Sequence, residues 1–223
     1  MSNQQIQKAY EAERKIIKQT IQENDGPNSV FGAINLHHSR TDEAKGSIET
    51  YSKVETSCKK GCNYCCYFKT EVGAEEVFLI ADYILNHFDK ANLDTVLKKA
   101  QSNKKKISNL STGKRIQTNI ECALLKEGEC SVYPVRPSTC RKMHSTDIDA
   151  CKASFDKPED GSNQNAEVPL LSSVLLSMSS AARQGLNDAG LDSNLYDLNE
   201  VIYDALIDNK YQKRWKKGKK AFV

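Results

Sequence analysis

The distribution of cysteines is the feature that most constrains this chain. All eight lie between positions 58 and 151, and neither flank contains one. In a reducing compartment such clustering indicates metal ligation or redox chemistry, whereas in an oxidising compartment the same thiols could form four disulfides. A chain of 223 residues buries about 70% of its unfolded surface and folds without disulfides, which favours metal ligation. The candidate metal ligands are Cys58, Cys62, Cys65, Cys66, Cys122, Cys130, Cys140 and Cys151.

Composition and hydropathy indicate a cytoplasmic protein with no membrane-spanning segment. Hydrophobic residues make up 39% of the chain and charged residues 27%, as is typical of globular proteins. The longest apolar run covers only residues 77–81, far short of the roughly 20 residues that cross a bilayer. The first thirty residues lack the apolar core of a secretory signal, which agrees with a compartment that keeps thiols reduced.

Apolar residues recur at helical spacing in several parts of the chain. The pattern predicts helices over residues 4–23, 77–88, 92–110, 170–181 and 195–207, and no segment alternates as a strand would. The fold class is therefore mainly α, a helical domain in which cysteine-rich loops form a metal or cluster site.

The same patterns divide the chain into four predicted segments. Residues 1–57 are an N-terminal helical extension, and residues 58–155 are a cysteine-cluster metal-binding domain. Residues 156–208 supply C-terminal helices that pack on this domain, and residues 209–223 form a basic tail.

The first cysteine motif is C-x3-C-x2-C-C. The two residues between Cys62 and Cys65 allow both thiolates to reach one metal, and Gly61 supplies the backbone freedom that such a turn needs. These two cysteines are the firmest ligand candidates. Cys66 follows Cys65 directly, so it could complete a larger cluster or remain a nearby thiol outside the first coordination shell.

The second motif spans residues 122–151 and is stiffened by two prolines. Pro134 and Pro137 impose extended or turn geometry on the residues before them, which suits a loop that presents Cys130 and Cys140. His144 lies four residues beyond Cys140 and is the histidine best placed to add an imidazole ligand.

Two arginines flank one of these cysteines. Arg136 and Arg141 lie on either side of Cys140. Fixed positive charge beside a thiol favours the metal-binding thiolate, but the same arginines could instead pair with carboxylates. The sequence leaves both interpretations open.

Together the two motifs resemble a known family. The pattern C-x3-C-x2-C-C, followed by G-E-C-S-V-Y-P-V-R-P-S-T-C-R at residues 128–141, is similar to the YkgJ-type cysteine-cluster family, which is named for its CxxCxxCC motif and described as zinc- or iron-chelating. The resemblance covers residues 58–151 and departs from the motif in the three residues between the first two cysteines. It implies metal ligation by Cys58, Cys62, Cys65, Cys66, Cys122, Cys130 and Cys140, with Cys151 as a looser match.

The resemblance also bears on the cofactor. Flagellin lysine-methylases look like distant relatives that contain the motif and are associated with an iron-sulfur cluster. This implies a [4Fe-4S] cluster, with zinc as the alternative, because thiolates hold both.

Two basic segments suggest an alternative function. Residues 98–115 and 209–223 each contain seven Lys or Arg and no acid, which leaves 18 basic against 29 acidic residues elsewhere. The protein could therefore be a zinc-stabilised binding module that engages nucleic acid or an acidic protein. Tyr211 and Trp215 could stack on bases or anchor the tail to the core.

No motif identifies a reaction. The chain contains no glycine-rich nucleotide loop, no H-E-x-x-H and no G-x-S-x-G, so whether it is an enzyme stays open. Glu75 and Glu76 are expected to lie at a solvated helix start. Residues 28–57 are a mixed stretch whose pattern is less decisive and is compatible with a second helix. On such a helix the adjacent His37 and His38 would point in different directions, so they are not expected to share a metal.

Overall fold

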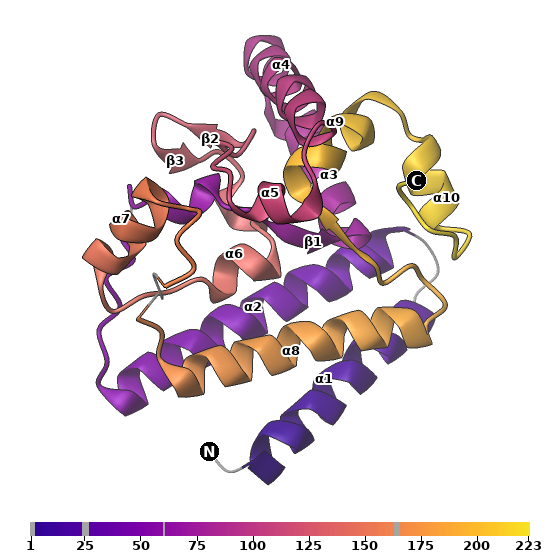
Figure 1. The fold of residues 1–223 in the computed structure, drawn as a ribbon. Helices are drawn as coiled ribbons and strands as arrows, with labels where there is room; N and C mark the ends of the chain where they lie inside the picture. Colours follow the sequence, from indigo (N-terminus) through magenta and orange to yellow (C-terminus); the bar gives the residue numbers. More distant parts are fainter. Residues whose placement is uncertain (1–2, 24–26, 60, 163–165) are drawn as a thin grey trace.

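A computed structural model describes residues 3–23, 27–59, 61–162 and 166–223 of the chain (Figure 1). Helices dominate these residues, which confirms the predicted mainly α class. In chain order the elements are α1 (Asn3–Glu23), α2 (Pro27–Ser52), η1 (Tyr64–Tyr67), β1 (Glu71–Gly73), α3 (Ala74–His87), α4 (Lys90–Ile107), α5 (Thr112–Ile116), β2 (Leu125–Lys126), β3 (Glu129–Cys130), η2 (Tyr133–Val135), α6 (Ser138–Lys142), α7 (Ile148–Asp156), α8 (Pro169–Asp188), β4 (Leu195–Asp197), α9 (Leu198–Ile207) and α10 (Lys210–Trp215). None of the described helices combines the length and the apolar character that a membrane span requires.

The three longest helices, α1, α2 and α8, form one layer of the molecule (Figure 1). Pro169 starts α8, where its missing N–H costs no hydrogen bond. An apolar stripe on α8 faces its neighbours, and Gly185 allows α1 to approach so closely that an added Cβ would lie 2.7 Å from the Arg14 carbonyl oxygen. The Arg14 side chain then binds Asp188 at 2.6 Å, which joins the middle of α1 to the C-terminal end of α8.

Helices α3, α4 and α9 form the other part of the fold, with α3 at its centre (Figure 1). Nearly every residue of α3 from Ala74 to Ala81 is buried, because the helix is covered on several sides. Asp89 begins α4 by accepting a hydrogen bond from the Asn92 N–H at 2.8 Å. Lys104 of α4 pairs with Asp204 of α9, and the buried Arg115 pairs with Asp197 at 2.6 Å.

The described residues also form strands that the sequence does not reveal. Strands β1 and β4 pair antiparallel, with Val72 opposite Tyr196, and β2 and β3 form a tight hairpin. The expected helix over 195–207 therefore begins only at Leu198, because its first three residues pair with β1. Strands of two or three residues are too short to show alternation, which is why the pattern missed them.

The C-terminal segment is packed into the core rather than extended into solvent. Trp215 is 1% exposed, and Phe222 stacks on Phe78 and Tyr211 at centroid distances of 5.5 Å and 5.3 Å. Of the two roles considered for Tyr211 and Trp215, the structure supports anchoring and leaves no free indole face for bases. One core contains residues from all four predicted segments, among them Ile17, Val132, Leu186 and Phe222.

Candidate metal centre

The eight cysteines lie on short elements and loops at one side of the helical core. All eight thiols are free, and only Cys58 is exposed. The loop before η1 carries Cys58 and Cys62, and η1 carries Cys65 and Cys66. The other four lie in the loop before β2, on β3, on α6 and on α7, and they are Cys122, Cys130, Cys140 and Cys151.

Backbone hydrogen bonds align the two cysteine motifs, although 56 residues separate Cys66 from Cys122 in the sequence. The Cys122 N–H donates to the Cys66 carbonyl at 2.8 Å, and the Ile120 N–H donates to the Tyr67 carbonyl at 2.9 Å. On α7, Phe155 packs its ring between Tyr64 and Tyr67 of η1, with centroid distances of 5.6 Å and 4.9 Å. The distant stretches are therefore held together without a disulfide.

Three sulfurs receive hydrogen bonds from the backbone two residues further on. The N–H groups of Tyr64, Leu124 and Val132 donate to the thiols of Cys62, Cys122 and Cys130 respectively. The hairpin that ends in Cys130 turns at Glu127 and Gly128, both of which have positive φ. N–H donors aimed at sulfur stabilise negative charge on it, which is what a metal-bound thiolate requires.

The thiols form two neighbouring groups that meet at Cys65. Within the inner group, the pKa of Cys140 is raised by burial and then by Cys122, Cys65 and Cys130. Cys66 belongs to this group through a hydrogen bond with Cys65. The outer group comprises Cys58, Cys62 and Cys151, and each of these also interacts electrostatically with Cys65. We call the inner thiols Cys65, Cys66, Cys122, Cys130 and Cys140 and the outer thiols Cys58, Cys62 and Cys151.

Burial disfavours the thiolate form of Cys122 and Cys130. It raises the pKa of Cys122 to about 12 and also raises that of Cys130. As placed, no three His, Cys, Asp or Glu side chains of the described residues already surround a metal position. The sulfurs are thus neighbours rather than a closed coordination shell, and metal binding here would require the thiols to lose their protons.

The chemistry of this donor set fits the metals that the sequence suggests. It consists of sulfur atoms, partly buried and supplied with backbone N–H donors, and thiolates bind zinc or iron-sulfur clusters in preference to Mg²⁺ or Ca²⁺. The residues therefore fit either zinc or an iron-sulfur cluster.

The two arginines beside Cys140 pair with a carboxylate, which was one of the two roles considered for them. Arg141 binds Asp42 of α2, and Arg136 binds the same carboxylate at 3.2 Å. Arg141 also donates to the Arg136 and Pro134 carbonyls at 2.8 Å and 2.7 Å, so it fixes the proline-containing loop. Both guanidinium groups favour the Cys130 thiolate, but burial of this thiol outweighs them.

Helix α6, which carries Cys140, is capped by a buried carboxylate from α3. Glu76 Oε1 accepts from the Ser138 N–H at 2.6 Å and lies 3.0 Å from His38 Nε2. Burial alone would raise the pKa of Glu76, but the hydrogen bonds from His38 and Ser138 outweigh it and lower the pKa. The expectation that Glu75 and Glu76 are solvated is therefore wrong, since they are 6% and 5% exposed.

His144 serves as a structural cross-link. Its Nδ1 donates to the Lys142 carbonyl at 2.8 Å, and its Nε2 accepts from the Val168 N–H at 3.0 Å. Both ring nitrogens are thus engaged by backbone groups, and the expected imidazole ligand is not offered to a metal. His37 and His38 pair with Glu13 and Glu76 respectively, so they do point in different directions.

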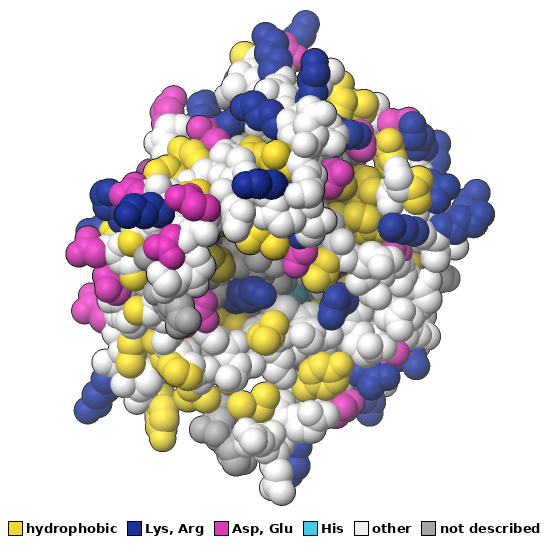
Figure 2. Space-filling view, viewed as in Figure 1, with side chains coloured by type: hydrophobic (Ala, Val, Ile, Leu, Met, Phe, Trp, Pro, Cys, Tyr) yellow, Lys and Arg dark blue, Asp and Glu magenta, His cyan; other side chains and the backbone are white. Residues whose placement is uncertain are grey.

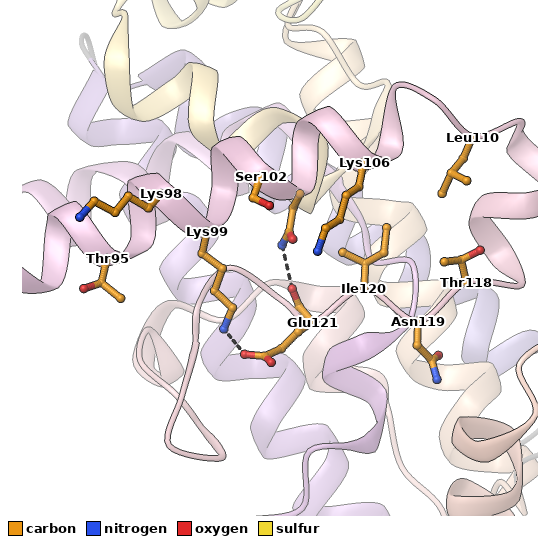
Figure 3. Close-up of a pocket in the computed structure, with 11 residues that line it drawn as sticks. Thr95, Lys98, Lys99, Ser102, Lys106, Leu110, Thr118, Asn119, Ile120 and Glu121 are labelled. Atoms are coloured by element: carbon orange, nitrogen blue, oxygen red, sulfur yellow. Dashed lines mark hydrogen bonds and ion pairs between the residues drawn. The ribbon is translucent and has the colours of Figure 1, made fainter.

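The loop that carries Cys122 is fixed to α4 by polar contacts (Figure 3). Lys99 binds Glu121 and also donates to the Leu125 carbonyl at 2.8 Å. Asn103 donates to the Glu121 carbonyl at 2.7 Å, and Asn199 of α9 accepts from the Ala123 N–H at 2.9 Å. No pattern in the sequence indicates these contacts, because the partners are far apart in the chain.

Comparison with known proteins identifies the cysteine-bearing part of the chain. Residues 57–165 match the model of the CxxCxxCC family, described as a putative zinc- or iron-chelating domain. The match confirms the family that the motifs resemble and includes all eight cysteines. Searches of the curated proteins and of the solved structures found no match.

Proposed function

Since residues 57–165 are a CxxCxxCC zinc- or iron-chelating domain, we propose that this protein holds a [4Fe-4S] cluster, and that four of the inner thiols, Cys65, Cys122, Cys130 and Cys140, are its ligands. The observation that carries the proposal is the mutual influence of these four thiols, which come from two distant parts of the chain. A [4Fe-4S] cluster takes four cysteine ligands, which this set supplies.

The remaining thiols have a separate proposed role. Cys66 and the outer thiols Cys58, Cys62 and Cys151 are further candidate ligands, either of a second ion or of a larger centre that includes Cys65. A bound iron-sulfur cluster would supply electron-transfer capacity, whereas zinc would fix the loops without redox chemistry. No substrate is assigned to the centre.

Elemental analysis under anaerobic conditions tests this proposal. We expect iron and acid-labile sulfide in equal amounts, about four of each per chain, with absorption near 400 nm. Cys140→Ser should abolish the cluster, whereas Cys58→Ser, which changes the exposed thiol of the outer group, should leave it bound. Stoichiometric zinc without sulfide would overturn the [4Fe-4S] assignment and leave zinc as the metal.

A second candidate function rests on a basic groove beside α4 (Figure 3). This open cavity of about 750 Å³ is lined by Lys98, Lys99 and Lys106, together with polar residues of the 118–121 loop. Lys99 is paired with Glu121, whereas Lys98 and Lys106 have no ion-pair partner among the described residues. We propose that the groove attracts a nucleic acid or an acidic protein.

Binding to nucleic acid at several salt concentrations tests the second function. Lys98→Glu with Lys106→Glu should weaken retention at low salt, because both changes reverse charges in the groove. The matched control is Lys210→Glu, which changes a lysine of the other basic segment that is paired with Asp208. Equal retention by all variants would rule out nucleic acid at this groove.

A further inference from the structure

A second polar site lies in a cavity between α2, α3, α6 and α8. It has a volume of about 120 Å³, and none of the eight cysteines lines it. Figure 2 shows its opening as a hollow between α6 and α8, with a histidine at the floor and Lys or Arg side chains on two sides. The lining residues that the argument uses are Ile34, His37, Glu75, Lys142, Leu176 and Arg183.

Two buried polar atoms in this cavity have no partner in the described part of the chain. They are His37 Nε2 and Glu75 Oε2, and their residues are 1% and 6% exposed. Buried polar groups in proteins nearly always have a hydrogen-bond partner, so two such atoms lining one cavity indicate a missing ligand. The Glu75 carboxylate lies against Gly73, where an added Cβ would displace it from this position.

The hydrogen bond of His37 Nδ1 determines whether Nε2 of the same ring donates or accepts. His37 Nδ1 lies 2.7 Å from Glu13 Oε1. Burial would raise the pKa of Glu13, but hydrogen bonds with His37 and Arg40 outweigh it and lower the pKa to about 2. The ionised carboxylate only accepts, so Nδ1 carries a proton, and in the imidazole with this single proton Nε2 is an acceptor that lines the cavity.

Positively charged side chains also line the cavity. Lys142 and Arg183 both line the cavity, and neither has an ion-pair partner among residues 3–23, 27–59, 61–162 and 166–223. The cavity is thus lined both by two unpartnered polar atoms of buried residues and by two cations, one of which, Arg183, acts electrostatically on Glu75. Ile34 and Leu176 add apolar surface to the lining.

We propose that this cavity binds a small α-amino acid as its zwitterion, with the ammonium group donating to His37 Nε2 and Glu75 Oε2 and the carboxylate facing Lys142 and Arg183. An ammonium group carries three donors, enough to satisfy both unpartnered atoms. A carboxylate complements the guanidinium and ammonium groups of these two side chains. Burial raises the pKa of Glu75, and an ammonium group beside the carboxylate would offset this effect by favouring the ionised form.

The size of the cavity limits the ligand. At about 30 Å³ of liquid per water molecule, 120 Å³ holds about four waters, or an amino acid with a very small side chain. Nucleotides and other drug-sized ligands need roughly 300 Å³ or more and are excluded.

Calorimetric titration of the purified full-length protein with glycine, methylammonium and acetate tests the proposal. Glycine should bind at least about tenfold more tightly than either half-ligand, because only glycine carries both an ammonium and a carboxylate group. Phenylalanine should not bind, since its ring exceeds the available volume. If glycine binds no better than both half-ligands, the zwitterion proposal fails, and ordered water is the occupant.

Substitutions of residues that line the cavity test whether glycine binds there. Glu75→Gln keeps the shape of the side chain and removes its charge, and we expect it to weaken glycine binding about tenfold or more. Arg183→Ala changes an exposed residue that does not threaten folding and should weaken glycine but not methylammonium. The matched control is Glu55→Gln, at an exposed carboxylate that does not line the cavity. Unchanged glycine affinity in both test variants would overturn the assignment, and it would leave the metal content of the thiol groups unaffected.

Discussion

The layer formed by α1, α2 and α8 and the loops that carry the cysteines are stabilised in different ways. The helical layer buries a continuous apolar stripe, including Leu171 and Leu175 at 0% exposure. The cysteine-bearing segments 57–68 and 120–151 instead consist of short helices, two-residue strands and turns, held by single hydrogen bonds and by Arg141. Long helices with an apolar face are stabilised by packing against one another, whereas such loops need a further source of stability, which a bound metal would supply.

Metal removal has the largest expected effect, and it should affect the two regions differently. A structural zinc in a thiolate site contributes about 10–16 kcal/mol of apparent binding free energy. We therefore expect chelation to increase hydrogen exchange strongly in residues 57–68 and 120–151, while exchange in α1 and α8 changes little. Mass spectrometry of deuterated peptides measures both at once. A uniform increase over the whole chain would contradict the division into two regions.

The helical layer should respond to loss of apolar contacts instead. Leu171→Ala removes a fully buried side chain from the cluster that also contains Ile48 and Met178. Replacing a buried leucine with alanine costs about 2–5 kcal/mol, and this cost should appear in denaturant unfolding with the metal content unchanged. The matched control on the same helix is Leu176→Ala, at a side chain that is 55% exposed, which should cost far less. Loss of metal in the Leu171 variant would show that the layer and the loops unfold as one unit.

The same contrast explains what the sequence could reveal. Most of the long helices were predictable because apolar spacing is local, and α1 and α3 begin and end close to the expected residues. The longest, α2, was not, because the pattern over its residues is mixed. The ligand candidates were predictable because their types and spacing are local as well. The residues that hold them, Asp42 and Glu76, lie 99 and 62 positions from the Arg141 and Ser138 that they bind, and no spacing rule connects such partners.

Substitution of Glu76, a carboxylate that joins the two regions, should have an intermediate effect on the free energy of unfolding. Glu76 links His38 in the helical layer to the start of α6, so Glu76→Gln weakens two charge-assisted hydrogen bonds at a buried site. We expect a loss of about 1–3 kcal/mol in the free energy of unfolding at neutral pH. Chemical denaturation of the variant and the natural protein measures the difference.

The pH dependence of that difference tests its electrostatic origin. Burial opposes ionisation of Glu76, but the hydrogen bonds from His38 and Ser138 prevail, so its pKa in the folded state is below the usual glutamate value of 4.5. Its stabilising contribution is therefore present above pH 4.5 and is lost as pH falls through the folded-state pKa. The glutamine variant does not titrate, so the gap between the two proteins should narrow in acid. A gap that stays constant with pH would mean that shape, not charge, is lost.

The smallest expected effect concerns an ion pair on the surface of the cysteine-bearing region. Lys152 and Asp156 pair across one turn of α7, and both side chains are about half exposed. Exposed pairs at this spacing contribute about 0.3–0.5 kcal/mol, and salt screens them. Lys152→Ala should therefore change the free energy of unfolding by no more than this, although α7 carries Cys151. A much larger loss of stability, or release of metal, would contradict this expectation. It would mean that the Lys152–Asp156 pair, rather than the ring of Phe155, holds α7 against η1.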